Sequence, residues 1–167
     1  MLRKIKKQYS SASFGSDVEI INWKNLKLGN NVSIQDRVVL HCGGVEWCNN
    51  TGGIEIGDNS VISPNCIFWG CGAVIKIGKN FDCGPSVKIF ASRTKYEDLT
   101  RYPERNNHLF KDVVIGDDVI IFTNVVINPG VTVGDGAVIG ANSLVLQDIP
   151  PFSVVAGSPA KFIKIRG

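Results

Sequence analysis

Two histidines, His41 and His108, are the side chains best suited to acid–base chemistry in this chain of 167 residues. The pKa of an ordinary imidazole lies near neutral pH, so histidine can take a proton from a hydroxyl group and pass it on. We therefore take His108 and His41 as candidate general bases. The alternative for either residue is an exposed loop histidine without a chemical role.

Five cysteines are the other candidates for reactive chemistry. Cys66 and Cys83 fall on apolar positions of a repeat, where we expect them to pack as small hydrophobic residues. Cys42, Cys48 and Cys71 lie between repeats, and their spacing differs from the Cys-x-x-Cys pairs of structural zinc sites. We expect no metal, leave the role of these three cysteines open, and expect reduced thiols.

An apolar repeat with a period of six residues must position these side chains. Its clearest run is Ile115, Ile121, Ile127, Val133, Ile139 and Val145. An apolar or small residue also precedes each of them by two places. Neither an α-helix nor an ordinary strand has this period, and hexapeptide repeats are typical of a parallel β-helix. We predict an all-β prism in which three hexads make one coil and the aliphatic residues face inward.

Three earlier coils show the same register and are separated by insertions. They consist of Leu28, Ile34 and Leu40; Ile56, Ile62 and Phe68; and Ile77, Cys83 and Ile89. The spacing after the third hexad of each coil rises from 6 to 16, 9 and 26 residues. The insertions should therefore leave the prism at one corner and form a ridge, because coils stack at roughly 4.8 Å. Both histidines fall on this ridge, which we predict to be the binding face.

The length predicts one domain, residues 1–167. We divide it into an N-terminal cap and first turn over residues 1–25 and a β-helix over residues 26–147, with an inserted loop at 91–111. A C-terminal cap follows over residues 148–167. The repeat stops at two consecutive prolines, which cannot donate hydrogen bonds to a parallel ladder.

Charge and hydropathy exclude several classes of protein. A net charge of +3 is too small to indicate a nucleic-acid partner, and no apolar run is long enough to span a membrane. The chain begins with a basic run that no apolar stretch follows, so we do not expect a secretory signal and place the protein in the cytoplasm. We interpret this run as a solvated end, and contact with a membrane surface stays open as an alternative. Its basic residues are Arg3, Lys4, Lys6 and Lys7.

The segment Val114–Lys164 resembles the C-terminal half of hexapeptide-repeat acyltransferases. It is most similar to the sugar O-acetyltransferases, which include the maltose, galactoside and surface-polysaccharide acetyltransferases. The resemblance is carried by Asn128-Pro129-Gly130-Val131, Gly140-Ala141, Pro150-Pro151 and Ala156-Gly157-Ser158-Pro159-Ala160-Lys161. It implies a left-handed coil, a homotrimer with its active sites in grooves between neighbours, and acetyl coenzyme A (acetyl-CoA) as the acyl donor.

The resemblance also implies where the donor binds. By position in the matching motif, the pantetheine arm would lie along small residues at the turns, and basic tail residues would meet the nucleotide phosphates. The expected wall consists of Thr123, Gly140, Ala141 and Asn142, and the expected phosphate contacts are Lys161, Lys164 and Arg166. The alternative is that the small residues only shape the corners and that the tail residues only face water.

The chain departs from the resembled family in the large inserted loop. Family members carry a histidine there, whereas this chain reads Ala91-Ser92-Arg93-Thr94-Lys95-Tyr96-Glu97-Asp98. A second departure lies near the expected donor site, where Ile120 and Phe122 replace the usual residues. For this reason the general base is sought in His108 or His41.

Our prediction is an acetyl-CoA-dependent acetyltransferase that acts on a sugar hydroxyl in polysaccharide or lipopolysaccharide synthesis. Aromatic ridge residues could stack on the sugar; they are Trp47, Trp69, Phe68, Phe90 and Tyr96. Phe68 is also an interior position of the repeat, and Trp47 and Trp69 could equally fill the contact between subunits. The alternatives are a catalytically degenerate trimer that serves as a scaffold or binding protein, and a nucleotide-sugar N-acetyltransferase. A γ-class carbonic anhydrase is disfavoured, because it needs three histidine ligands and this chain has two histidines.

Overall fold

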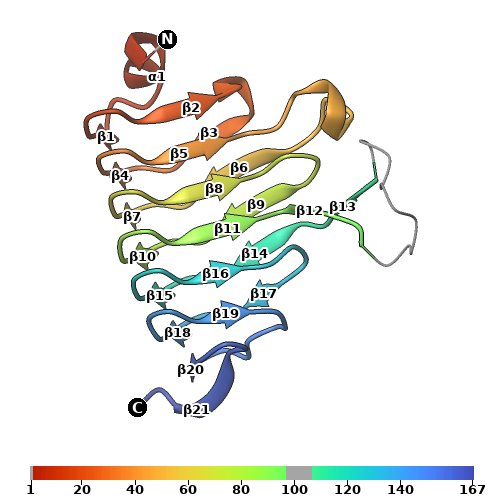
Figure 1. Ribbon diagram of the computed structural model, residues 1–167. Helices are drawn as coiled ribbons and strands as arrows, with labels where there is room; N and C mark the ends of the chain where they lie inside the picture. The colour runs from red at the N-terminus through yellow and green to blue at the C-terminus, as the bar shows by residue number, and fades with distance from the viewer. Residues whose placement is uncertain (1, 97–106) are drawn as a thin grey trace.

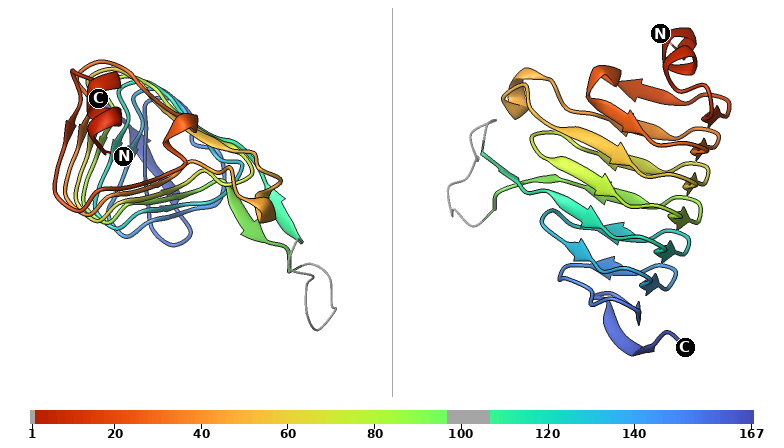
Figure 2. Two further views of the ribbon diagram at one scale, coloured as in Figure 1. Left: turned by 90° about the horizontal axis from the view of Figure 1, so that it is seen from above. Right: turned by 180° about the vertical axis from the view of Figure 1, so that it is seen from behind.

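A computed structural model describes residues 2–96 and 107–167, with no account of the Leu2 side chain. The chain winds into a left-handed parallel β-helix, a prism with three flat faces (Figures 1 and 2). This confirms the predicted fold class. Face A contains β1 (Ser13–Phe14), β4 (Ser33–Ile34), β7 (Val61–Ile62), β10 (Asp82–Cys83), β15 (Ile120–Ile121), β18 (Val138–Ile139), β20 (Ser153–Ala156) and β21 (Lys161–Ile165).

The other two faces are also sheets in which each strand pairs with its equivalent in the next coil. Face B contains β2 (Glu19–Ile21), β5 (Val39–His41), β8 (Ile67–Trp69), β11 (Lys88–Phe90), β16 (Val126–Ile127) and β19 (Leu144–Val145). Face C contains β3 (Leu26–Leu28), β6 (Gly53–Ile56), β9 (Val74–Ile77), β14 (Val113–Ile115) and β17 (Thr132–Val133).

Asparagine side chains hold one corner of the prism in register. Asn31, Asn59 and Asn80 all adopt left-handed backbone conformations, which asparagine tolerates better than most residues. The Nδ2 atom of Asn31 donates to Oδ1 of Asn59 over 3.2 Å, and Nδ2 of Asn59 donates to Oδ1 of Asn80 over 3.4 Å. The ladder ends on Asp118, whose Oδ1 accepts from Asn80 over 2.8 Å. The residue type that permits the turn therefore also links successive turns.

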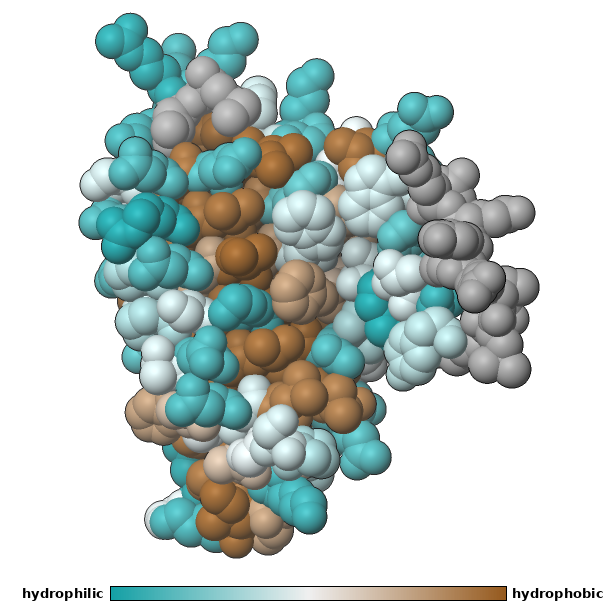
Figure 3. Space-filling model, viewed as in Figure 1, coloured by the Kyte–Doolittle hydropathy of each residue, from teal (hydrophilic) through white to brown (hydrophobic). Residues whose placement is uncertain are grey.

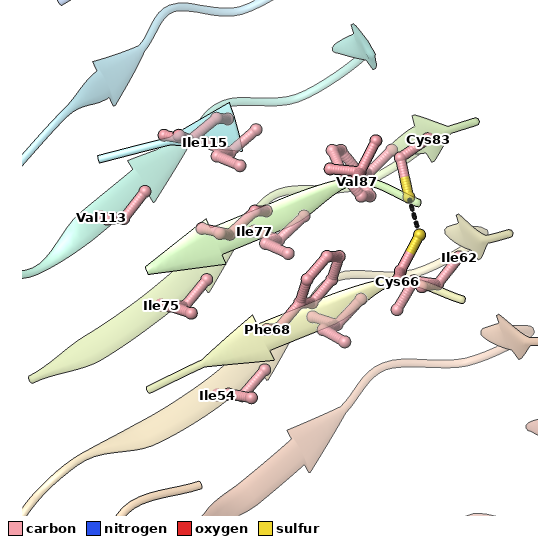
Figure 4. Close-up of a cluster of buried hydrophobic side chains, with 14 of the residues drawn as sticks. Ile54, Ile62, Cys66, Phe68, Ile75, Ile77, Cys83, Val87, Val113 and Ile115 are labelled. Atoms are coloured by element: carbon pink, nitrogen blue, oxygen red, sulfur yellow. Dashed lines mark hydrogen bonds between the residues drawn. The ribbon is translucent and has the colours of Figure 1, made fainter. Parts of the chain in front are cut away.

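The interior is filled by the residues of the six-residue repeat, stacked coil upon coil (Figure 4). Phe68 is fully buried and meets Phe81 edge to face, with the ring centroids 6.4 Å apart. Cys66 and Cys83 are also fully buried, with their Sγ atoms 3.8 Å apart. Both cysteines occupy interior positions as predicted.

All three insertions leave the prism between face B and face C, which confirms the predicted ridge (Figure 2). The first contains the short 3-10 helix η2 (Glu46–Cys48), and the second is the brief turn between β8 and β9. The third carries an antiparallel hairpin of β12 (Ser92–Thr94) and β13 (His108–Phe110). Glu97 and Asp98 of this insertion lie outside the described residues.

The two ends of the prism are closed differently. Helix α1 (Leu2–Gln8) packs on the N-terminal end, and β1 and β2 already belong to faces A and B, so the first coil begins inside residues 1–25. Another short 3-10 helix, η1 (Trp23–Asn25), links β2 to face C. At the opposite end β20 pairs with β18, and β21 folds back antiparallel on β20 (Figure 1). Among the described residues no helix is long and apolar enough to cross a membrane.

Candidate active site

His41 lies at the ridge corner, where face B ends and the first insertion begins. It is the last residue of β5, and its side chain is only 6% exposed. Its ring packs against Trp69 of the next coil, with the ring centroids 4.3 Å apart. The thiol of Cys71 lies against the same ring, with Sγ 3.0 Å from Nδ1 and 3.6 Å from Nε2. Both contacts come from the next coil, Trp69 from β8 and Cys71 from the insertion that follows it.

The pair of His41 and Cys71 is electrically neutral at neutral pH. Burial lowers the pKa of the His41 imidazole below its usual 6.5, and nearby Glu19 opposes this shift. Burial and the neighbouring Cys48 raise the pKa of the Cys71 thiol to about 12. The histidine is therefore an unprotonated imidazole that can accept a proton, whereas the thiol is not a nucleophile at neutral pH.

His108 reaches the same ridge from the hairpin of the third insertion. Its ring lies against Trp47 of the first insertion, with the centroids 4.9 Å apart, and nearly parallel to Phe110 at 6.0 Å. The Nδ1 atom of His108 is buried and has no hydrogen-bond partner. A buried nitrogen without a partner is costly to a fold, and a bound polar group would satisfy it. The structure thus brings both sequence-predicted histidines to one ridge, each in its own aromatic environment.

Gly72 permits the hairpin to pack on the second insertion. Its backbone has φ +78°, and a Cβ at this position would overlap the ring of Phe110. Any larger residue would push the hairpin, and with it His108, away from Trp47. The shortest insertion therefore controls the position of the longest one.

Aromatic residues line the outer surface beside His41, but not all those expected. Trp69 and Phe90 are neighbours in register on β8 and β11, and both side chains are half-buried. Phe68 points into the prism and is fully buried, so it is not available to stack on a sugar. Tyr96 is 76% exposed, and the Arg93 guanidinium lies 4.6 Å from the centre of its ring.

The residues expected to form the donor wall gather at the opposite edge of face B, where face A ends. The Asn142 backbone N–H donates to the Thr123 carbonyl over 3.0 Å, and the two residues therefore sit on adjacent coils. A Cβ on Gly140 would lie 2.7 Å from the Ala156 Cβ, so glycine is needed for the coils to approach here. Thr123, Ala141 and Asn142 are exposed.

The basic tail residues behave differently from one another. Lys161 and Lys164 lie on β21 with exposed side chains, as expected for residues that could meet phosphates. Arg166 is exposed as well, but its Nη1 also donates to the carbonyl oxygens of Asp118 and Gly136 over 3.1 Å and 3.0 Å, and its contact with phosphate stays a prediction. Its guanidinium is engaged in holding the tail on the prism. Lys161 also lines a cavity of about 280 Å³ with Leu146 and Phe162.

No metal centre accompanies these groups within the described residues, where no cluster of three or more His, Cys, Asp or Glu side chains could hold an ion. The cysteines of the ridge, Cys42, Cys48 and Cys71, are buried and free. Cys48 donates to the carbonyl oxygens of Val45 and Thr51 over 3.2 Å and 3.4 Å. Its thiol therefore stabilises the fold of the first insertion.

The repeat that builds these corners matches a known family model. Residues 112–147 match the model described as bacterial transferase hexapeptide (six repeats). This part of the chain therefore carries a hexapeptide repeat. The matched residues include Thr123, Gly140, Ala141 and Asn142 of the donor wall.

Solved structures of several acyltransferases share the fold over the whole prism. An acetyltransferase of Vibrio cholerae O1 biovar eltor, complexed with acetyl coenzyme A, is 27% identical with a TM-score of 0.68, covering 99% of this chain and 78% of that one. A maltose O-acetyltransferase of Clostridium difficile 630 is 28% identical with a TM-score of 0.63, and the likeness covers 99% of this chain and 74% of that one. An N-acyltransferase of Bacillus cereus, complexed with dTDP and 3-hydroxybutyryl-CoA, is 23% identical with a TM-score of 0.79. This likeness covers 100% of this chain and 89% of that one, and it supports the fold of this chain but not its activity.

Three residues near His41 were not singled out as its partners from the sequence. Leu40 and Phe68 are equivalent interior positions of adjacent coils, and His41 and Trp69 directly follow them. The parallel register between coils therefore already predicts that the side chains of His41 and Trp69 are adjacent. Cys71 offers no such indication, because it lies in an insertion whose path the repeat does not determine. Glu19, one coil earlier on face B, influences the His41 pKa and could have been found from the same register.

Proposed function

We propose that this protein transfers an acetyl group from acetyl-CoA to a hydroxyl group of a sugar, in the assembly of a polysaccharide or lipopolysaccharide. The observation that carries the proposal is the placement of two histidines on one edge of face B and of the small-residue wall on the other. The likeness to acetyltransferases at 27% and 28% identity supports the same chemistry. We place the enzyme in the cytoplasm, where its five free cysteines would stay reduced.

The reaction needs little from the protein beyond positioning and one base. A thioester is already activated, so the sugar hydroxyl oxygen attacks the acetyl carbonyl once the two are held together. The base takes the hydroxyl proton, an oxygen ester forms, and coenzyme A leaves as its thiol after receiving that proton. His41 is our first choice because its lowered pKa keeps it unprotonated, and His108 is the second because its Nδ1 lacks a partner.

Within one copy of the chain the two halves of this site lie apart. The histidine ridge and the donor wall are separated across face B, whose strands are at most three residues long, by roughly 10 Å. His41 on β5 also lies three to four coils from the wall residues beside β16 and β19, or roughly 14–19 Å along the prism axis, whereas His108 lies nearer to them because it follows β11. We infer a homotrimer in which the ridge of one copy faces the donor wall of the next. Each active site would then contain residues from two copies.

The outer surface of face B supports this assembly. Its side chains are largely apolar and run in register along the prism, in a band that Figure 3 shows on the front of the molecule. The band includes Val39, Ile67, Val126 and Leu144, and Lys88 interrupts it between Ile67 and Val126. The equivalent positions of face C carry mainly charged and polar residues, among them Lys27, Glu55, Lys76 and Thr132. A mostly apolar outer surface of this kind favours an interaction site.

The double substitution His41→Ala with His108→Ala tests the proposed chemistry. We expect acetyl transfer to fall at least about 10²-fold, which is the contribution usual for a positioned base. Binding of acetyl-CoA, measured by calorimetry, should stay within about twofold, since neither histidine belongs to the donor wall. Thr94→Ala is the matched control, because Thr94 pairs with His108 across the hairpin yet is exposed.

The outcomes separate the proposal from its main alternative. Full turnover in the double variant would discard both histidines as bases. A wild-type protein that binds no acetyl-CoA would instead point to a trimeric scaffold or binding protein, an alternative that the absent loop histidine favours. Transfer to an amino sugar rather than to a hydroxyl would reassign the acceptor and leave the site unchanged.

A further inference from the structure

The positive charge of this protein is concentrated at one end. The chain has 18 Lys and Arg residues against 15 Asp and Glu residues. Four of the basic residues, Arg3, Lys4, Lys6 and Lys7, lie within α1, which contains no acidic residue. Without these four the formal net charge would be −1, since 14 basic residues would face 15 acidic ones. The whole excess of positive charge therefore sits on one short helix.

Packing against the first coil holds this helix in place. Ile5 is fully buried in the core, and the Tyr9 N–H donates to the Ile5 carbonyl over 2.9 Å. The Tyr9 hydroxyl donates to the Leu26 carbonyl on face C over 2.6 Å. Helix α1 is thus anchored by one apolar side chain and one tyrosine, and it cannot turn its charged surface inward.

The four basic side chains all face solvent. Across the part of the chain that the structure describes, the one ion pair joins Lys27 to Glu55, so none of the four has a carboxylate partner there. Helix α1 lies over the N-terminal end of the prism, and β21 lies at the other end (Figures 1 and 2). The charges therefore form an outward-facing basic platform, a name we use for Arg3, Lys4, Lys6 and Lys7.

We propose that the basic platform docks this protein on an anionic lipid surface, with the prism axis pointing away from the membrane. Helix α1 projects beyond the first coil at one corner of this end, so its basic residues can reach a lipid surface before the strands do (Figure 1). Each basic residue near such a surface strengthens binding by about fivefold. The apolar Ile5 is turned inward, so attachment would rest on charge alone and would be reversible. Tyr9, the aromatic residue that anchors the helix, is bonded to the first coil and is not free to stack on a nucleic-acid base.

Assembly would multiply the effect. In the homotrimer proposed above, a threefold axis along the prisms would place three basic platforms on the same side, and binding at several points strengthens attachment without new contacts. His41 lies only one coil beyond the first strand of face B, or roughly 5 Å along the axis. Docking at this end would therefore hold the histidine ridge close to the lipid headgroups.

Sedimentation with lipid vesicles tests the proposal. The wild-type protein should sediment with vesicles of phosphatidylcholine and phosphatidylserine, should stay in solution with phosphatidylcholine alone, and should dissociate as salt is raised. The variant Arg3→Gln, Lys4→Gln, Lys6→Gln, Lys7→Gln should bind the anionic vesicles at least about tenfold more weakly. The control variant removes four exposed charges elsewhere, Lys76→Gln, Lys79→Gln, Lys95→Gln and Lys111→Gln, and should keep most of the binding.

Three outcomes would overturn the proposal. These are no binding to anionic vesicles by the wild type, an equal loss in both quadruple variants, and tighter binding to single-stranded RNA than to the vesicles at the same salt. Circular dichroism of the platform variant checks that it folds. Sedimentation velocity and acetyl transfer without vesicles check the trimer and the proposed reaction separately, so a failure of either is distinguishable from a failure to bind lipid.

Discussion

Burial of the His41 imidazole against Trp69 and Cys71 sets the pH range in which it can act as a base. Its pKa is lowered from 6.5 because charging the ring would require water that burial excludes. The unprotonated, active form therefore persists below pH 6.5. We expect the acid limb of kcat/KM to fall below that value, and an NMR titration of His41 to give the same midpoint.

The outcome that would contradict this prediction is an acid limb at or above pH 6.5 that survives in His41→Gln.

The lowered pKa of His41 also affects the stability of the fold. The unfolded chain binds a proton at His41 more readily than the folded chain, so this contribution to stability is present above pH 6.5 and is lost as the pH falls through the folded pKa. Chemical denaturation of wild type and His41→Gln at several pH values measures it.

Among the elements, the coils of the prism depend on large side chains that fill the space between strands. Phe68 on β8 is fully buried and meets Phe81 edge to face. Phe68→Ala would leave a cavity that the stacked backbone cannot close, so the free energy of unfolding should fall by about 3–5 kcal/mol. Urea denaturation measures the loss.

The matched control for the core is Phe162→Ala on β21, where the side chain is 59% exposed. We expect this change to shift the free energy of unfolding by less than about 0.5 kcal/mol. Equal losses in both variants would mean that β21 is buried by another copy of the chain.

The whole molecule presents one apolar and one polar outer face, and this contrast predicts how copies associate. Val126→Glu would place a negative charge on the mostly apolar face B, between Lys88 and Leu144, and should dissociate the proposed trimer into folded monomers. Thr132→Glu makes the corresponding change on face C and should leave the trimer intact. Sedimentation velocity distinguishes the two, and a Val126→Glu protein that stays trimeric would place the interface elsewhere.

Sequence analysis could predict the coil, its three faces and the common corner of the insertions from spacing alone. Interior positions recur because a side chain six residues on occupies the same place on the next face, and this depends only on local geometry. The same register predicted that Cys66 and Cys83 are buried. It did not predict that Arg166 binds carbonyl oxygens of two turns, because the tail follows no repeat.

By itself, the sequence determined the β-helix and the edge of the prism on which both histidines lie. Only the tertiary structure decided what each histidine touches, since His41 meets Cys71 from 30 residues away and His108 meets Trp47 from a different insertion. The physical reason is that insertions have no period, so their paths depend on packing between loops, such as the approach of Phe110 to Gly72. The repeat sets where a loop leaves the prism, and contacts among the loops set the environment of the proposed base.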